Sequence, residues 1–177
     1  KTITATAYLM IYNMVESTMT EAIDAVHQQL RQDNMTFSQL SEKLKEVCFK
    51  NFKSSIESTR ERQNKGETFD SALVWLGYKK DNHWNGNIDA RSIRTTAAKY
   101  GFNIAPTDYT ATRHGESLLK VKTTRNKLAH GEVSFEECGQ GTAIEELMEI
   151  HEQAVMYLSA VIDGIETYLD NKAYVAA

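Results

Sequence analysis

The stretch TAIEELMEIHEQAVMYLSAVIDGIETYLD, residues 142–170, decides the fold because it is long, lacks proline and repeats its apolar side chains at helical spacing. Apolar residues that recur about every 3.6 positions define one face of an amphipathic helix. Most glutamates of the stretch lie off that face. It therefore predicts a long helix over about 142–170 whose apolar stripe packs on a core: Ile144, Leu147, Met148, Val155, Leu158, Ile162, Ile165 and Leu169.

The same spacing recurs upstream. Apolar side chains at helical intervals predict a long first helix over about residues 4–31. Thr36 or Ser38 can cap a second helix that runs to about residue 62, and Asn64 to Gly66 ends it. Two long helices packed antiparallel with shorter ones would form an up-and-down bundle.

Two further helices complete the prediction. Asn87 or Asp89 can cap a helix that reaches Tyr100, and Gly101 suits its C-terminal end. A fourth helix is predicted over about 110–130, with Gly131 after its last residue. Residues of about 64–87 lack a clear period and predict a loop-rich insertion.

Composition supports an all-α single domain over residues 1–177, a bundle of about four to five helices. One proline and nine glycines leave long runs of good helix formers, and 177 residues can bury a core without disulfides. The two cysteines, Cys48 and Cys138, belong to no CxxC pair, so we expect a reducing, cytoplasmic setting. No apolar run is long enough for a membrane span, and no membrane partner is expected.

Charge is distributed unevenly along the chain. Residues 43–130 carry 17 basic and 9 acidic side chains, whereas residues 131–177 carry 1 basic and 10 acidic. Affinity for a phosphate backbone depends on local Lys and Arg density, so the net charge of −4 does not exclude a nucleic-acid substrate. It argues against a protein that coats nucleic acid indiscriminately.

The stretch Arg125-Asn126-Lys127-Leu128-Ala129-His130 is the main candidate site. Asn126 and His130 are four positions apart and share a helix face, and the long Arg125 side chain can swing toward them. A histidine can donate or accept a proton at neutral pH, and an arginine can stabilise charge on a phosphate. These residue types suit attack of an RNA 2′-hydroxyl on its own phosphodiester, with no metal required.

Residues 125–130 resemble the Rx4-6H motif of the HEPN superfamily. In them an arginine is followed by a polar residue, three further residues and a histidine, late in a helix of an all-α domain. The stretches Tyr12-Asn13-Met14-Val15-Glu16-Ser17 and Gly86-Asn87-Ile88-Asp89-Ala90-Arg91 also resemble a bacterial HEPN-like nuclease family found near defence genes. The resemblance implies that Arg125 and His130 are catalytic and that Asn126 supports them.

The resemblance carries further expectations. It implies a homodimer in which two motifs form one composite site, a metal-independent endoribonuclease that leaves 2′,3′-cyclic phosphate and 5′-hydroxyl ends, and a role as a toxin or phage-defence effector. Some HEPN toxins have a tyrosine two residues after the histidine, which their antitoxin modifies. Here that residue is Glu132, so an inhibitor or sensor protein encoded nearby would act in another way.

Other polar residues are candidates for substrate binding. Lys120, Lys122, Lys127 and Arg113 would form an RNA-binding patch or simply a solvated helix face. Asn13 and Glu16, part of the resemblance, would line the cleft or serve as ordinary hydrogen-bonding residues.

The aromatic side chains of the insertion, Trp75, His83 and Trp84, would stack on unpaired bases, or pack in the core or an interface, the commoner role. We expect no metal and no cofactor, because the histidines and cysteines lack metal-site spacing and no phosphate-binding glycine motif is present. The alternative function is a non-catalytic helical module that binds a protein or a nucleotide.

Overall fold

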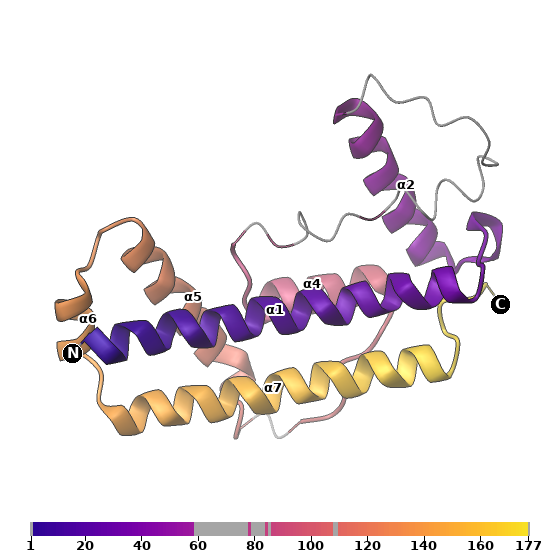
Figure 1. Cartoon of the computed structure of the whole chain (residues 1–177). Coiled ribbons are helices and arrows are strands. Elements are labelled where there is room, and N and C mark those ends of the chain that lie inside the picture. The colour runs from indigo at the N-terminus through magenta and orange to yellow at the C-terminus, as the bar shows by residue number, and fades with distance from the viewer. Residues whose placement is uncertain (1, 59–77, 79–83, 85, 108–109, 177) are drawn as a thin grey trace.

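The computed structural model describes residues 2–58, 78, 84, 86–107 and 110–176 of the chain, and for 54–58 only the backbone. Within these ranges it is helical, with no strand beyond one isolated antiparallel bridge between Leu40 and Val175. The predicted all-α class is confirmed (Figure 1).

The two longest helices, α1 (Thr2–Gln32) and α7 (Ile144–Asp170), lie side by side and run in the same direction (Figure 1). The early part of α1, around Met10, lines one groove with the early part of α7, around Met148. Their later parts, around Ala22 and Ile165, line another. The expected antiparallel packing of these two helices is corrected to a parallel one, because the helices between them return the chain to the starting end of α1.

A short 3-10 turn, η1 (Phe37–Gln39), follows α1 and precedes α2 (Glu42–Ser58). Thr36 caps η1 rather than α2, so α2 begins later than predicted. Helix α4 (Ala90–Tyr100) confirms the third predicted helix. Its N-cap is Asp89, whose side chain accepts from the Ser92 backbone N–H at 2.8 Å, and Gly101 ends it at a φ of 90°.

The fourth predicted helix is shorter than expected. Helix α5 spans Glu116–Ala129, and the predicted start near residue 110 is wrong. A second 3-10 turn, η3 (Arg113–Gly115), comes before it, and its three residues all have positive φ. A Cβ on Gly115 would lie 2.4 Å from the Ala90 Cβ, so the close approach of this turn to α4 requires glycine.

Helix α6 (Phe135–Gln140) was not predicted. It begins with a capping box, in which the Ser134 Oγ accepts from the Glu137 N–H at 3.1 Å and the Glu137 carboxylate accepts from the Ser134 N–H at 2.8 Å. The sequence signal for such a box, Ser-x-x-Glu, is present at residues 134–137.

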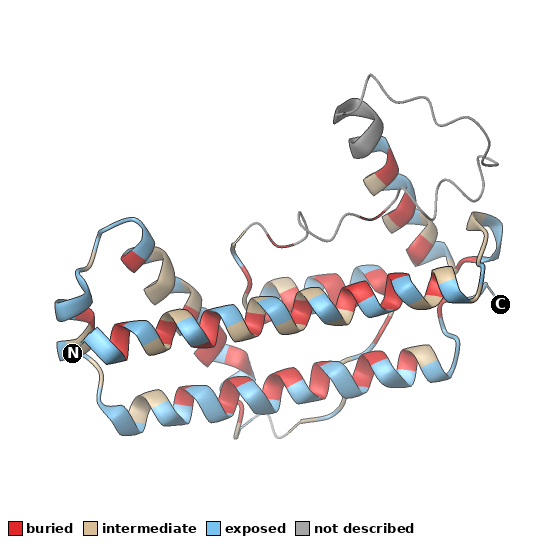
Figure 2. Ribbon diagram, viewed as in Figure 1, coloured by how far each residue is buried: buried red, intermediate tan, exposed pale blue. Residues whose placement is uncertain are grey.

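The core lies between α1 and the helices around it, where buried residues line the inner faces (Figure 2). Helix α1 contributes more of the largest fully buried side chains than any other described helix, among them Tyr8, Tyr12, Met19 and Ile23. Two residues of the predicted insertion, Tyr78 and Trp84, are also buried in this core. The other predicted aromatic residues of the insertion, Trp75 and His83, lie outside the described residues.

Candidate active site

The C-terminal end of α5 fixes the position of His130. The Glu132 N–H donates to the Lys127 carbonyl at 2.9 Å and the Gly131 N–H to the Leu128 carbonyl at 3.3 Å, with a φ of 69° at Gly131. These are the two hydrogen bonds of a Schellman motif, which closes a helix tightly. His130 is the last residue before the left-handed glycine, and its side chain is exposed. An imidazole so placed can reach a substrate.

The guanidinium of Arg125 packs on α1. Its Cζ lies 4.7 Å from the centroid of the Tyr12 ring, within the range of a cation–π interaction. The Tyr12 ring is buried, and its hydroxyl accepts the Ile88 backbone N–H at 3.4 Å. Burial raises the pKa of Tyr12 despite the opposing effects of the Ile88 N–H and the Arg125 charge, so the hydroxyl stays protonated at neutral pH.

Residues 86–89, here called the strap, connect Arg125 to the start of α4. The Arg125 Nη1 donates to the Gly86 carbonyl at 3.4 Å and to the Asn126 Oδ1 at 3.0 Å. Gly86 has a φ of 68°, and a Cβ there would lie 3.4 Å from both terminal guanidinium nitrogens. The positive φ therefore favours glycine at this turn, whereas a Cβ at 3.4 Å would only be in ordinary van der Waals contact with the guanidinium.

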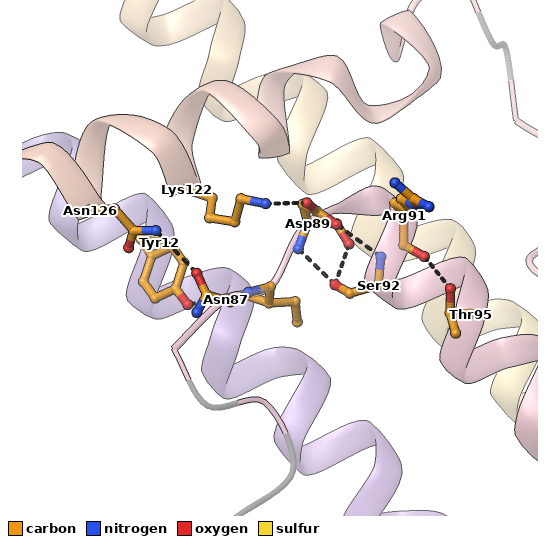
Figure 3. A network of polar contacts seen from close by, with 9 residues as sticks. Tyr12, Asn87, Asp89, Arg91, Ser92, Thr95, Lys122 and Asn126 are labelled. Carbon is orange, nitrogen blue, oxygen red and sulfur yellow. Dashed lines mark hydrogen bonds and ion pairs between the residues drawn. The ribbon is translucent and has the colours of Figure 1, made fainter.

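Two more side chains of α5 hold the strap. The Asn126 Nδ2 donates to the Asn87 Oδ1 at 3.1 Å, and Lys122 forms an ion pair with Asp89 (Figure 3). Partial burial would raise the pKa of Asp89, but the Lys122 ammonium and the Ser92 N–H together lower it below its ordinary value. Asp89 is thus an ionised carboxylate that joins α4 to α5.

Three separate segments of sequence meet around this strap: the start of α1 at Tyr12, residues 86–89, and the last two turns of α5. A family model described as HEPN_MAE_28990-like HEPN matches residues 1–174 of the chain. The chain belongs to this HEPN family. The match covers nearly the whole sequence and confirms the resemblance to the HEPN superfamily. No curated protein and no solved structure matches the chain.

Membership of the HEPN family indicates a nuclease-type or otherwise RNA-related function, since HEPN domains commonly bind RNA and dimerise. Among the residues that the structure describes, no helix is both long and apolar enough to cross a membrane. In the same residues no three His, Cys, Asp or Glu side chains gather as metal ligands would.

The predicted RNA-binding cations of this HEPN domain lie on two sides of α5. Lys122 faces the strap, whereas Lys120 and Arg113 line a groove between α5 and α7 together with Lys127. In that groove Lys120 pairs with Glu146, which raises the lysine's pKa, and Arg113 pairs with Glu149 at 2.8 Å. Lys127 is exposed. The four cations therefore do not form one continuous surface.

The two predicted cleft residues of α1 differ in exposure. Asn13 is exposed, and Glu16 is half-buried, with its charge acting on Tyr12. Trp84 is 9% exposed, which leaves little of its ring for stacking on a base. The residues that sequence reasoning did not assign to the site are Tyr12, Gly86 and Asn87, although each lies in a segment that carried the family resemblance.

Proposed function

We propose that the chain is a metal-independent endoribonuclease whose catalytic residues are Arg125, Asn126 and His130. One observation carries this proposal: the last two turns of α5 present an exposed histidine, and an arginine and an asparagine held in place by the strap, within six residues. A phosphodiester at the end of α5 can meet a proton-transfer group and a fixed positive charge together.

The chemistry follows from the residue types. His130 acts as general base or acid while the 2′-hydroxyl attacks the adjacent phosphorus and the 5′-oxygen leaves. Arg125 stabilises the negative charge that builds on the non-bridging oxygens. Its 3.4 Å contact with the Gly86 carbonyl is long for a hydrogen bond, so a phosphate can replace it while the Tyr12 ring still supports the guanidinium. The products are a 2′,3′-cyclic phosphate and a 5′-hydroxyl.

The proposal includes a homodimer in which the motifs of two copies form one composite site. Met10 and Tyr12 are two residues apart, about 200° around α1, so the apolar groove of α1 and α7 that includes Met10 opens away from the motif. A dimer with facing motifs must therefore use the α5 side. The proposed biological role is that of a toxin or phage-defence effector in the cytoplasm, restrained by an inhibitor or sensor protein.

The first test compares RNA cleavage by the wild type, Arg125→Ala and His130→Ala. The two variants should cleave at least 10² times more slowly, the usual contribution of a general acid or base. His151→Ala is the matched control, because His151 is an exposed histidine on α7 in the apolar groove. Cleavage by His130→Ala at the wild-type rate would reject the assignment.

The second test addresses the composite site. Arg125→Ala and His130→Ala should each be nearly inactive alone. We expect their mixture to regain part of the activity, because a heterodimer supplies one intact arginine and one intact histidine to a shared cleft. Two separate sites would give no recovery, since each would lack one residue. Equilibration of the subunits is checked beforehand with differently tagged copies.

A second candidate function is a non-catalytic binding module. The observation in its favour is that Arg125 already has structural contacts with Tyr12, Gly86 and Asn126, so the motif has a role in holding the fold. Under this function the protein binds RNA or a partner protein and does not cleave RNA. Arg125→Ala then lowers only the stability of the fold.

A further inference from the structure

A polar groove runs along α4 from the strap. It has a volume of about 400 Å³, and its lining includes Asn87, Arg91, Thr95 and Lys99. One end of the groove is at Asn87, whose side-chain oxygen accepts a hydrogen bond from the Asn126 amide. The groove therefore starts beside Asn126 and leads away from it along α4. Figure 3 shows Asn87, Arg91 and Thr95 in this order from the strap along the helix.

Arg91 and Lys99 are the cations of this groove. Both are exposed, and among the described residues neither is paired with a carboxylate. Among the described residues of the lining, Asp89 is the acidic one, and Lys122 neutralises it. The described lining of the groove thus carries a net positive charge, in contrast to the groove between α5 and α7, where Lys120 and Arg113 are paired with glutamates.

The spacing of the two cations suits a polymer with repeated charges. Residues 91, 95 and 99 follow one another at intervals of four and lie on one face of α4. Eight residues of helix span about 12 Å, so two positive charges stand along a line rather than around one point. The backbone N–H groups at the start of α4 are already satisfied in part by Asp89, which leaves the side chains as the binding groups.

We propose that this groove binds the phosphate backbone of single-stranded RNA and leads it to the end of α5. Arg91 and Lys99 each contact a phosphate, and Asn87 marks the point where the strand reaches Asn126 and His130. This proposal rests on the proposed nuclease function, for which it names the path of the substrate. Single-stranded RNA suits this groove because the groove follows the strap and one helix. The phosphates of a single strand can contact the cations along that one line.

Binding is measured separately from cleavage. In the His130→Ala background, the affinity for a short fluorescent single-stranded RNA is determined by anisotropy over a range of salt concentrations. Adding Arg91→Ala and Lys99→Ala should weaken binding about tenfold or more at low salt, and should reduce the slope of log affinity against log salt by roughly 1.4, since each phosphate contact on a single strand contributes about 0.7. Arg91→Lys with Lys99→Arg should retain both the affinity and the slope.

The control removes the same charge elsewhere. Lys50 and Lys53 are exposed cations of α2, and their replacement by alanine should leave the salt slope unchanged. If the α4 pair (Arg91→Ala with Lys99→Ala) and the α2 pair (Lys50→Ala with Lys53→Ala) weaken RNA binding equally, the affinity depends on overall charge and the groove proposal is overturned. An unchanged affinity in the α4 pair overturns it as well.

Kinetics distinguish the groove from the nuclease itself. In the otherwise wild-type chain, the Arg91→Ala and Lys99→Ala pair should raise KM while kcat at saturating RNA changes little. Cleavage with an unchanged KM would reject the groove and leave the nuclease proposal intact. If the wild type does not cleave RNA, but the Arg91→Ala and Lys99→Ala pair still weakens RNA binding, the nuclease proposal is rejected and the groove remains as an RNA-binding site.

Discussion

The guanidinium of Arg125 lies over the ring of Tyr12, with 4.7 Å between Cζ and the ring centroid, so α1 supports the charge that the end of α5 would offer to a phosphate. Arginine is flexible and costs conformational entropy to fix. A buried ring beneath it, the Gly86 carbonyl and the Asn126 amide together limit that freedom. Pre-positioned charge is what electrostatic stabilisation of a transition state requires.

Replacement of Tyr12 separates support of Arg125 from general stability. Tyr12→Leu removes the cation–π contact, worth about 0.5–2 kcal/mol, and should lower the cleavage rate by about tenfold. Tyr12→Phe keeps the ring but leaves the buried Ile88 N–H without its acceptor, so it should lose about 1 kcal/mol of stability and retain most activity. Single-turnover cleavage and urea unfolding measure the two effects. Equal loss of activity in both variants would show that the ring does not position Arg125.

The backbone conformation of Gly131 should determine how firmly His130 is held at the end of α5. Gly131→Ala forces a Cβ into a φ of 69°, at a cost of roughly 1 kcal/mol, although no atom lies within 4 Å to clash with it. The Schellman motif loosens, His130 loses its fixed position, and cleavage should fall more than stability does. Gly131→Asn is the control, because asparagine tolerates this conformation better. Thermal unfolding and cleavage are compared; identical activity in all three proteins would contradict the prediction.

The ion pair between Asp89 and Lys122 predicts a pH-dependent stability. Because the pKa of Asp89 is lowered in the folded protein, its contribution is fully present above the unfolded value near 3.8 and is lost as pH falls through the lower folded value. Asp89→Asn keeps a good N-cap but removes the charge, so it should destabilise the fold by about 1 kcal/mol at neutral pH. Urea unfolding at several pH values should show this difference shrinking below about pH 4. A difference that stays constant with pH would mean that the ion pair contributes nothing.

Gly164 should be essential to the packing of α7. A Cβ there would lie 2.0 Å from the Asn103 carbonyl oxygen, against backbone that cannot easily move. Gly164→Ala should therefore destabilise the fold by about 1–3 kcal/mol or more, despite the higher helix propensity of alanine. Gly141→Ala is the matched control, since its nearest neighbour would be 3.9 Å away. Thermal unfolding tests both, and a neutral Gly164→Ala would contradict the close contact.

Helices could be predicted from the sequence wherever one apolar stripe faced the core. The periods of α1 and α7 and the caps Asp89 and Gly101 placed three of the helices to within a few residues. The start of α5 was missed because positive φ at Arg113 and His114 follows from tertiary packing, which residue type does not reveal. The parallel direction of α1 and α7 depends on how the intervening helices fold back.

The site was predictable only along α5. The spacing of Asn126 and His130 places them on one face, and Gly131 marks the end of the helix. The contacts of Arg125 with Tyr12 and Gly86 join residues 113 and 39 positions apart, and no local pattern encodes such a meeting. The cations of η3 and α5 could be identified from the sequence, but their pairing with Glu146, Glu149 and Asp89 depends on neighbouring helices.

The most direct measurement is cleavage of a single-stranded RNA in the presence of EDTA by the wild type and by His130→Ala, with analysis of the ends produced. The wild type should cleave and leave 2′,3′-cyclic phosphate and 5′-hydroxyl ends, whereas His130→Ala should be at least about 10² times slower. Equal cleavage by the two proteins, or wild-type activity that disappears with EDTA, would contradict it.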